Sequence, residues 1–69
     1  MTEEFPKRLQ NLRERQHKSR LVVSELCGLH PGAIARYERG EAVPDVSSLI
    51  AIADYFNVSI DYLLGRTNY

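Results

Sequence analysis

The sequence predicts an all-α fold of five short helices, and three observations support this prediction. Apolar residues recur at intervals of three and four, and no segment alternates apolar and polar residues for long enough to predict a strand. Glycine or proline separates the periodic segments, where helices end or begin. The 69 residues, 43% of them hydrophobic, suffice for one small core. We therefore expect a single domain over residues 1–69, with its core in 5–66.

The first helix is expected over residues 3–16. Its apolar face repeats at positions i, i+4 and i+7, and Pro6 is tolerated because it lies in the first turn. The residues of this face are Phe5, Leu9 and Leu12.

The segment from Ser19 to Gly40 predicts two short helices joined by a tight turn. Ser19 is expected to cap the earlier helix, and Gly28 to end it. Pro31 is expected to open the later helix, because its fixed φ suits a first helical turn. The residues expected to face inward are Val23, Leu26, Cys27, Ile34 and Tyr37. This pattern is a helix-turn-helix, in which the second helix, here residues 31–39, can lie in the major groove of DNA.

The last two helices follow a loop in which Pro44 prevents helix continuation. Either Asp45 or Ser47 caps the fourth helix, and Asn57 is a plausible end for it. Its buried face is expected to hold Leu49, Ile52, Ala53 and Phe56. A fifth, short helix is expected to begin at Ser59 and end at Gly65, burying Ile60, Leu63 and Leu64.

The charges are unevenly distributed although the net charge is zero. Residues 7–39 hold eight lysines and arginines against three glutamates, whereas residues 40–69 hold one arginine against four acidic residues. A basic half joined to an acidic half suggests one face turned toward phosphate. The alternative is that the basic side chains only solvate exposed helix faces.

Catalysis, a metal site and a cofactor are not expected. His17 and His30 lack metal-ligand spacing, the serines lack a nucleophile-elbow setting, and the glycines form no phosphate-binding loop. Cys27 is the single cysteine, so no internal disulfide can form, and we interpret it as a small core residue in preference to a reactive thiol.

Neither a membrane span nor a secretory signal is expected, so we predict a cytoplasmic protein. The uncharged run at residues 46–53 is too short to span a bilayer, and the N-terminal residues lack the apolar stretch of a signal peptide. The initial methionine and the end at Tyr69 favour a stand-alone form over a fragment of a longer regulator.

Four motifs resemble the XRE family of phage-repressor and Cro-type helix-turn-helix proteins. They are Arg-Leu-x-x-Leu-Arg at 8–13, Ser-x₅-Glu-Leu-x-Gly-Leu at 19–29, Ile-Ala-Arg-Tyr-Glu-Arg-Gly at 34–40 and Asn-Val-Ser-Ile-Asp-Tyr-Leu-Leu-Gly-Arg at 57–66. The likeness covers about residues 5 to 66. It implies a lambda-repressor-like domain that binds double-stranded DNA, most often as a repressor that acts as a homodimer on paired half-sites.

The resemblance also implies roles for single residues. Arg20 and Arg39 match positions that contact phosphate, with Ser19 and the amides of the first turn after it assisting Arg20. Arg36 matches a position that reaches a base edge, where arginine can pair with guanine. Arg13 and Glu38 match a pair that clamps the recognition helix in place, which we prefer to a direct DNA role.

The front of the recognition helix departs from the family pattern. Polar readers are usual there, but this chain has His30, Pro31, Gly32 and Ala33. Ala33 offers only a methyl contact, for example to thymine, and His30 is either a base contact, a local cap or an exposed ring. Pro31 and Gly32 would allow close approach of backbone amides to a phosphate. The acidic Glu41 and Asp45 also lie in a region that is often basic in the family, which would weaken backbone binding.

Leu21 and Val22 stand where the family usually has polar residues. Either they reflect a small change in packing, or they form a patch for a partner such as a toxin, an anti-repressor or a second subunit. A second function is therefore kept open, in which the chain is an antitoxin or anti-repressor that binds mainly protein. The candidate residues for dimerisation are Tyr55, Ile60, Tyr62 and Leu64.

Overall fold

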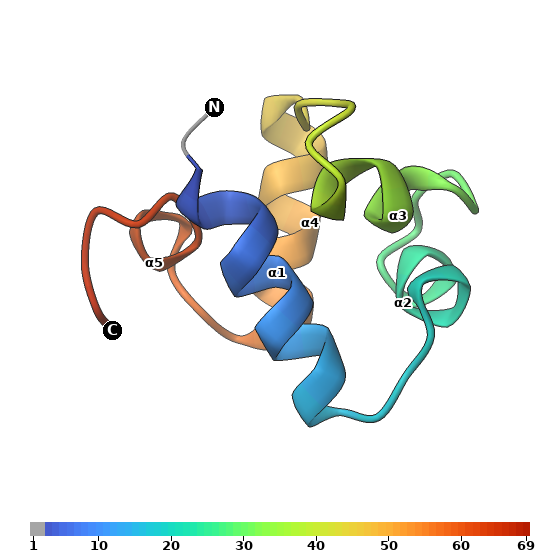
Figure 1. Cartoon of the computed structure of the whole chain (residues 1–69), viewed down its shortest axis with the longest axis horizontal. Helices are drawn as coiled ribbons and strands as arrows, with labels where there is room; N and C mark the ends of the chain where they lie inside the picture. Colours follow the sequence, from blue (N-terminus) through green and yellow to red (C-terminus); the bar gives the residue numbers. More distant parts are fainter. Residues whose placement is uncertain (1–2) are drawn as a thin grey trace.

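The computed structural model describes residues 3–69, which form five α-helices around one core (Figure 1). The helices are α1 (Glu4–Arg15), α2 (Arg20–Leu26), α3 (Ala33–Glu38), α4 (Val46–Phe56) and α5 (Ile60–Leu63). No strand occurs among residues 3–69, so the predicted all-α class and helix order are confirmed. Residues 1 and 2 of the expected domain lie outside the described residues.

Three helices begin at side-chain caps that the sequence predicts. The Ser19 hydroxyl accepts a hydrogen bond from the Val22 amide at 3.1 Å, and the Ser59 hydroxyl accepts one from the Tyr62 amide at 2.9 Å. At α4, a carboxylate oxygen of Asp45 accepts from the Ser48 amide at 2.8 Å, which decides for Asp45 over Ser47. Each cap satisfies an amide that has no partner within its own helix.

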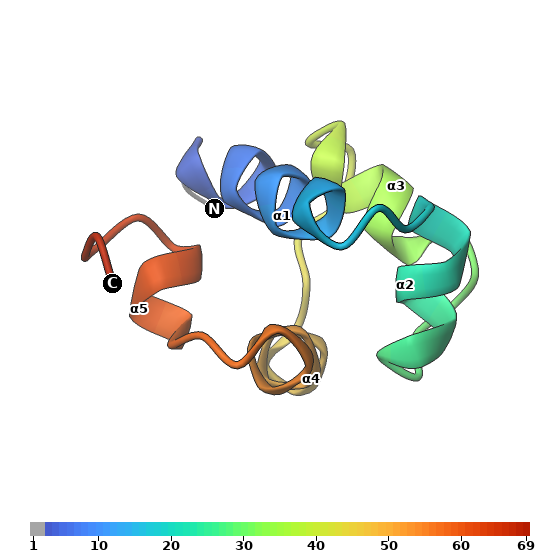
Figure 2. The same ribbon diagram turned by 90° about the horizontal axis from the view of Figure 1, so that it is seen from below.

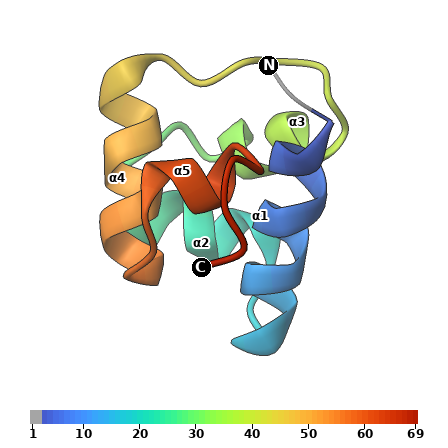
Figure 3. The same cartoon turned by 90° about the vertical axis from the view of Figure 1, so that its left-hand side faces the viewer.

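The core lies where α1, α3, α4 and α5 meet, with α2 packed on α3 at one side (Figures 2 and 3). α1 and α3 lie on one side of it and α4 on the other (Figure 2). The predicted inward faces of α1 and α3 are confirmed. The buried residues of the hydrophobic core are Phe5, Leu9, Leu12, Val23, Ala33, Ile34, Tyr37, Leu49, Ile52, Ala53 and Leu63.

One expected core position is wrong, because Leu26 is 53% exposed. Phe56, Ile60 and Leu64 pack against the core but are only partly buried. α2 packs chiefly on α3 and buries Val23 and Ser24, and Leu26 lies about 200° around the helix axis from Ser24. Cys27 is half-buried against the core, and this burial raises the pKa of its thiol, which favours the structural over the reactive interpretation.

Side chains from α1 and the loop after it fasten the C-terminal half of the chain. The Arg8 guanidinium donates to the Tyr62 carbonyl oxygen at 2.8 Å and lies 4.4 Å from the centre of the Tyr62 ring. The Tyr55 hydroxyl donates to the Gln16 side chain at 2.6 Å and accepts from Lys18 at 3.2 Å. None of the helices in residues 3–69 is long and apolar enough to cross a bilayer.

Candidate nucleic-acid interface

The α2–α3 unit is held together by Ser24, a buried residue that sequence reasoning missed. Its hydroxyl donates to the Arg20 carbonyl at 2.9 Å and accepts from the Ile34 amide at 3.1 Å. The Ser24 hydroxyl, one turn into α2, is therefore the acceptor for an amide in the first turn of α3, which has no partner within its own helix. The available signal was a serine in the middle of a short helix beside Val23, a place where serine commonly bonds back to a carbonyl four residues earlier.

The turn before α3 differs from the expectation. α3 begins at Ala33, so the expectation that Pro31 opens the helix is wrong; Pro31 and Gly32 lie in the turn. The reason is local, because the His30 ring nitrogen Nδ1 accepts from the Gly32 amide at 3.1 Å and the His30 carbonyl accepts from the Ala33 amide at 2.9 Å. The His30 ring is exposed and accepts this local hydrogen bond, and its contact with a base stays a prediction.

The same hydrogen bonds bear on the amide–phosphate contact expected at the front of the recognition helix. The amides of Gly32, Ala33 and Ile34 all donate within the chain. A phosphate there would have to displace these intramolecular acceptors. The front of α3 is thus held in place by intramolecular hydrogen bonds, and these three amides are not free donors.

The orientation of α3 is set by Glu38, which lies at its C-terminal end and whose side chain is only 2% exposed. Arg13 of α1 donates to both Glu38 carboxylate oxygens, at 2.7 and 3.1 Å. The hydrogen bond to Glu38 raises the pKa of Arg13 further above neutrality, against the lowering effect of burial. The expected clamp is therefore present with fork-to-carboxylate geometry, which is stronger than a single-point contact.

Arg20 joins this clamp, which sequence reasoning did not foresee. Its Nε lies 3.0 Å from a Glu38 oxygen, while its side chain stays 48% exposed. Glu38 thus links α1, α2 and α3 through two arginines. One carboxylate binds two guanidinium groups, so the cluster carries a net positive charge. Arg20 is the member of the cluster that is exposed to solvent.

Arg36 and Arg39 both face solvent, Arg36 from α3 and Arg39 from the position after it, but Arg39 is held in an ion pair. Arg36 is exposed on the outer side of α3. Arg39, the residue after α3, places two guanidinium nitrogens 2.8 and 3.2 Å from the two oxygens of Glu41. The hydrogen bond to Glu41 raises the pKa of Arg39, and the same bond lowers the pKa of Glu41.

The structure gathers three of the predicted site residues around one shallow hollow of about 300 Å³. His30, Ala33 and Arg36 line it, together with Tyr37, Ala42 and Val43. Ala33 is only 9% exposed, so little of its methyl surface remains for a thymine. Ser19 and Arg20 lie instead at the start of α2, joined to α3 through Glu38, and Arg39 lies at the far end of α3.

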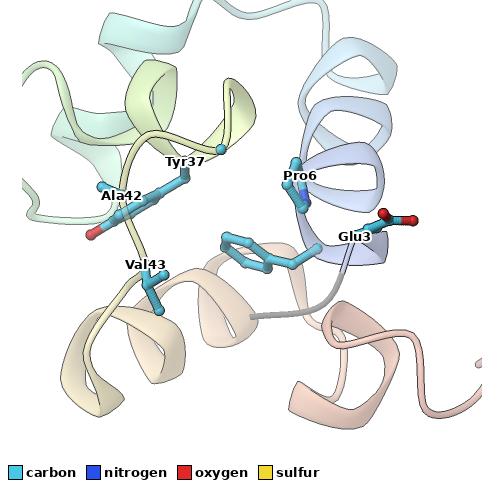
Figure 4. Close-up of a pocket in the computed structure, with 7 residues that line it drawn as sticks. Glu3, Pro6, Tyr37, Ala42 and Val43 are labelled. Atoms are coloured by element: carbon cyan, nitrogen blue, oxygen red, sulfur yellow. The ribbon is translucent and has the colours of Figure 1, made fainter.

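A second cavity, of about 250 Å³, lies between the start of α1 and the loop after α3 (Figure 4). Apolar surface from Pro6, Tyr37, Ala42 and Val43 lines most of it, and Glu3 is its ionisable carboxyl group. No cluster of potential metal ligands occurs in residues 3–69. These linings offer no constellation for acid–base or nucleophilic chemistry.

Comparisons with known proteins agree with this geometry. The family model described as helix-turn-helix, HTH_3, matches residues 9–63. The cryptic phage CTXphi transcriptional repressor RstR of Vibrio cholerae is 36% identical over 59 residues, which are 86% of this chain and 53% of that protein. The transcriptional regulator ImmR of Bacillus subtilis is 32% identical over 60 residues, 87% of this chain and 47% of that protein. The chain thus spans about half the length of these relatives, both of which are named as regulators of transcription and neither as an enzyme.

The fold is also that of a solved repressor. The P22 c2 repressor, in a crystal structure with a synthetic operator, superposes with a TM-score of 0.83 at 27% identity, covering 91% of this chain and 96% of that one. The solution structure of the P22 c2 DNA-binding domain gives a TM-score of 0.79 at 26% identity, covering 99% of this chain and 95% of that one. The motifs, the five-helix order and these matches converge, and the chain belongs to the XRE-type helix-turn-helix family.

Proposed function

We propose that this protein is a sequence-specific DNA-binding regulator of transcription, acting as a repressor. The observation that carries the proposal is the anchored recognition helix: Glu38 fixes α3 to α1 and α2, and Arg36 projects from its exposed side. An element that reads DNA must present its side chains in a fixed register, and this clamp supplies that register. The superposition on the P22 c2 repressor, solved with an operator, supports the proposal.

In the proposed complex α3 lies in the major groove. Arg36 reads a base edge, with guanine as its best partner because the O6 and N7 acceptors match the guanidinium fork. Arg20 and Arg39 contact phosphates and set the position of the domain, and Ser19 and the first amides of α2 assist at a phosphate. A DNA partner supports the proposal that the protein acts in the cytoplasm.

We further propose a homodimer on an operator with two-fold character, because a single six-residue α3 reads few base pairs. All four candidates for the contact are partly buried against the core and offer little surface to a second copy: Tyr55, Ile60, Tyr62 and Leu64. More apolar surface is exposed at Val43 and Val46, at 63% and 73%. Sedimentation with and without a two-half-site duplex tests this, and a one-to-one complex on that duplex contradicts it.

The deciding experiment is a selection from a randomised duplex library at near-physiological salt. The wild type, Arg36→Ala and Arg66→Ala are selected in parallel. Arg66 is a matched control because it is exposed and follows α5 in the sequence, and α5 lies away from α3 (Figure 1). We expect an enriched paired motif for the wild type and Arg66→Ala. Arg36→Ala should lose about 1–3 kcal/mol of discrimination at one guanine of each half-site. An unchanged motif in Arg36→Ala would show that Arg36 is not the reader.

A second candidate function, binding of a protein partner such as a toxin or anti-repressor, is favoured by α2. Three large apolar side chains of this short helix are exposed: Leu21 by 51%, Val22 by 42% and Leu26 by 53%. Exposed apolar side chains grouped in this way are typical of a surface that binds a partner. This function predicts that a second protein co-purifies in a stoichiometric amount. The double variant Leu21→Ser with Leu26→Ser should lose that protein and keep its binding to duplex DNA. Purification of the wild type without any such protein, together with an enriched motif in the selection, favours DNA as the main ligand.

A further inference from the structure

Glu41 lies at the end of the proposed recognition helix and engages its last arginine. It binds Arg39 through both carboxylate oxygens, and both side chains are 52% exposed. Arg39 matches a position that contacts phosphate in the family. In this chain the arginine already has an anionic partner, Glu41. A DNA phosphate would be a second anion for the same guanidinium.

The backbone places Glu41 there. Gly40 has a φ of +72°, so the chain reverses after α3, and the Glu41 amide donates to the Arg36 carbonyl at 2.9 Å while the Gly40 amide donates to the Tyr37 carbonyl at 3.1 Å. These two bonds hold residue 41 beside the last turn of α3. Arg39 is the hydrogen-bonded partner of the Glu41 carboxylate and the main cause of its lowered pKa, and the charge of Arg36 contributes least to that lowering.

We propose that Glu41 is an affinity-setting residue, which holds Arg39 as an intramolecular competitor of the DNA phosphate and so weakens binding to all sequences alike. This inference rests on the proposed function. Phosphate contacts carry no sequence information, so a competitor for one of them lowers affinity without altering the preferred operator. The pair is exposed, and the cost of opening it is therefore small.

The test is a double-mutant cycle on duplex binding with Glu41→Gln and Arg39→Ala. The probe is a mixed-sequence duplex at low salt, where phosphate contacts dominate the affinity. We expect Glu41→Gln to tighten binding about two- to five-fold, the range of an exposed ion pair. In the Arg39→Ala background the same substitution should tighten binding clearly less, because no arginine is left to release.

A matched control separates competition from bulk charge. Asp61→Asn removes one negative charge from another exposed pair, with Arg66, on α5. It should tighten binding less than Glu41→Gln does. An equal gain in the two variants, or an equal gain from Glu41→Gln with and without Arg39, overturns the inference and leaves long-range repulsion as the cause. Absence of any duplex binding by the wild type overturns the proposed function as well.

The motif that is selected gives a second readout. If Glu41 acts only through Arg39, the sequence enriched from a randomised library by Glu41→Gln should equal that of the wild type. A changed motif would show that Glu41 acts on base reading, and would contradict its role as a sequence-independent competitor.

Discussion

Single hydrogen-bonding side chains hold the recognition unit together. The hydroxyl of Ser24 supplies a polar bond within an otherwise apolar contact between α2 and α3. Glu38 does the same between α1, α2 and α3, with a carboxylate that would be costly to bury without its arginines. Both groups have their bonding satisfied, so they add orientation to the hydrophobic contact at little cost.

Replacing Ser24 by alanine should destabilise the protein by about 1–3 kcal/mol, because the buried Ile34 amide loses its acceptor. Urea unfolding followed by circular dichroism measures this difference. Ser47→Ala on the exposed side of α4 is the matched control and should change the free energy of unfolding by less than about 0.5 kcal/mol. Equal effects of the two substitutions would contradict the role given to Ser24.

Helices of four to twelve residues depend on their ends, because few of their hydrogen bonds are internal. Side-chain caps begin α2, α4 and α5, and residues with positive φ follow or end several helices. The end of α5 is also a packing site. A side chain at Gly65 would place its Cβ 2.5 Å from Cβ and Cγ of Glu4, so the chain after α5 approaches α1 more closely than any other residue type allows.

Gly65→Ala should therefore destabilise the protein by more than about 2 kcal/mol. A left-handed backbone conformation at φ +77° costs about 1–2 kcal/mol for alanine, and displacement of α1 adds to that cost. Gly32→Ala is the control, since φ is −92° there and the added Cβ meets only the His30 ring at ordinary contact distance. Thermal or urea unfolding compares the two, and equal stability of both variants would contradict the close approach at Gly65.

The uneven charge of the chain becomes an uneven charge in space. The basic segment forms α1, α2 and α3, and the acidic segment forms α4 and α5, with α3 and α5 on opposite sides of the molecule (Figures 1 and 2). The excess of basic residues overstates the charge available to DNA. Arg8 donates to the carbonyl oxygens of Tyr62 and Thr67, Arg13 and Arg20 share Glu38, and Arg39 binds Glu41.

Stability of the whole molecule should fall in acid. The Ser48 amide lowers the pKa of Asp45, and Arg39 lowers that of Glu41, so each carboxyl has a lower pKa folded than unfolded. Their stabilisation is complete above the ordinary carboxyl pKa of about 4 and is lost as the pH falls through the lowered folded values. Urea unfolding at about pH 7 and pH 3 should show a lower free energy of unfolding at the lower pH. The difference between the two pH values should be smaller in the double variant Asp45→Asn with Glu41→Gln. Asp54→Asn is the control, and a wild-type stability that is equal at both pH values would contradict the assignment.

Much of this protein was determined by short-range signals in its sequence. The spacing of apolar residues indicated five helices, and the caps at Ser19, Asp45 and Ser59 are set by bonds that reach only three residues along the chain. Signals of this range depend on local sterics and hydrogen bonding, which a single sequence contains. The Arg13–Glu38 clamp was predicted only through family resemblance, because its partners are 25 residues apart.

Tertiary structure alone decided which side of α2 is buried and which arginines are engaged. A seven-residue helix has too few turns for its apolar pattern to define one face, so contact with α3 selected Ser24 for the core and left Leu26 outside. The partners of Arg20 and Arg39 depend on where Glu38 and Glu41 come to lie once α3 is docked and its end has reversed. Charge counts cannot reveal such pairs, because an ion pair depends on distances in the folded chain.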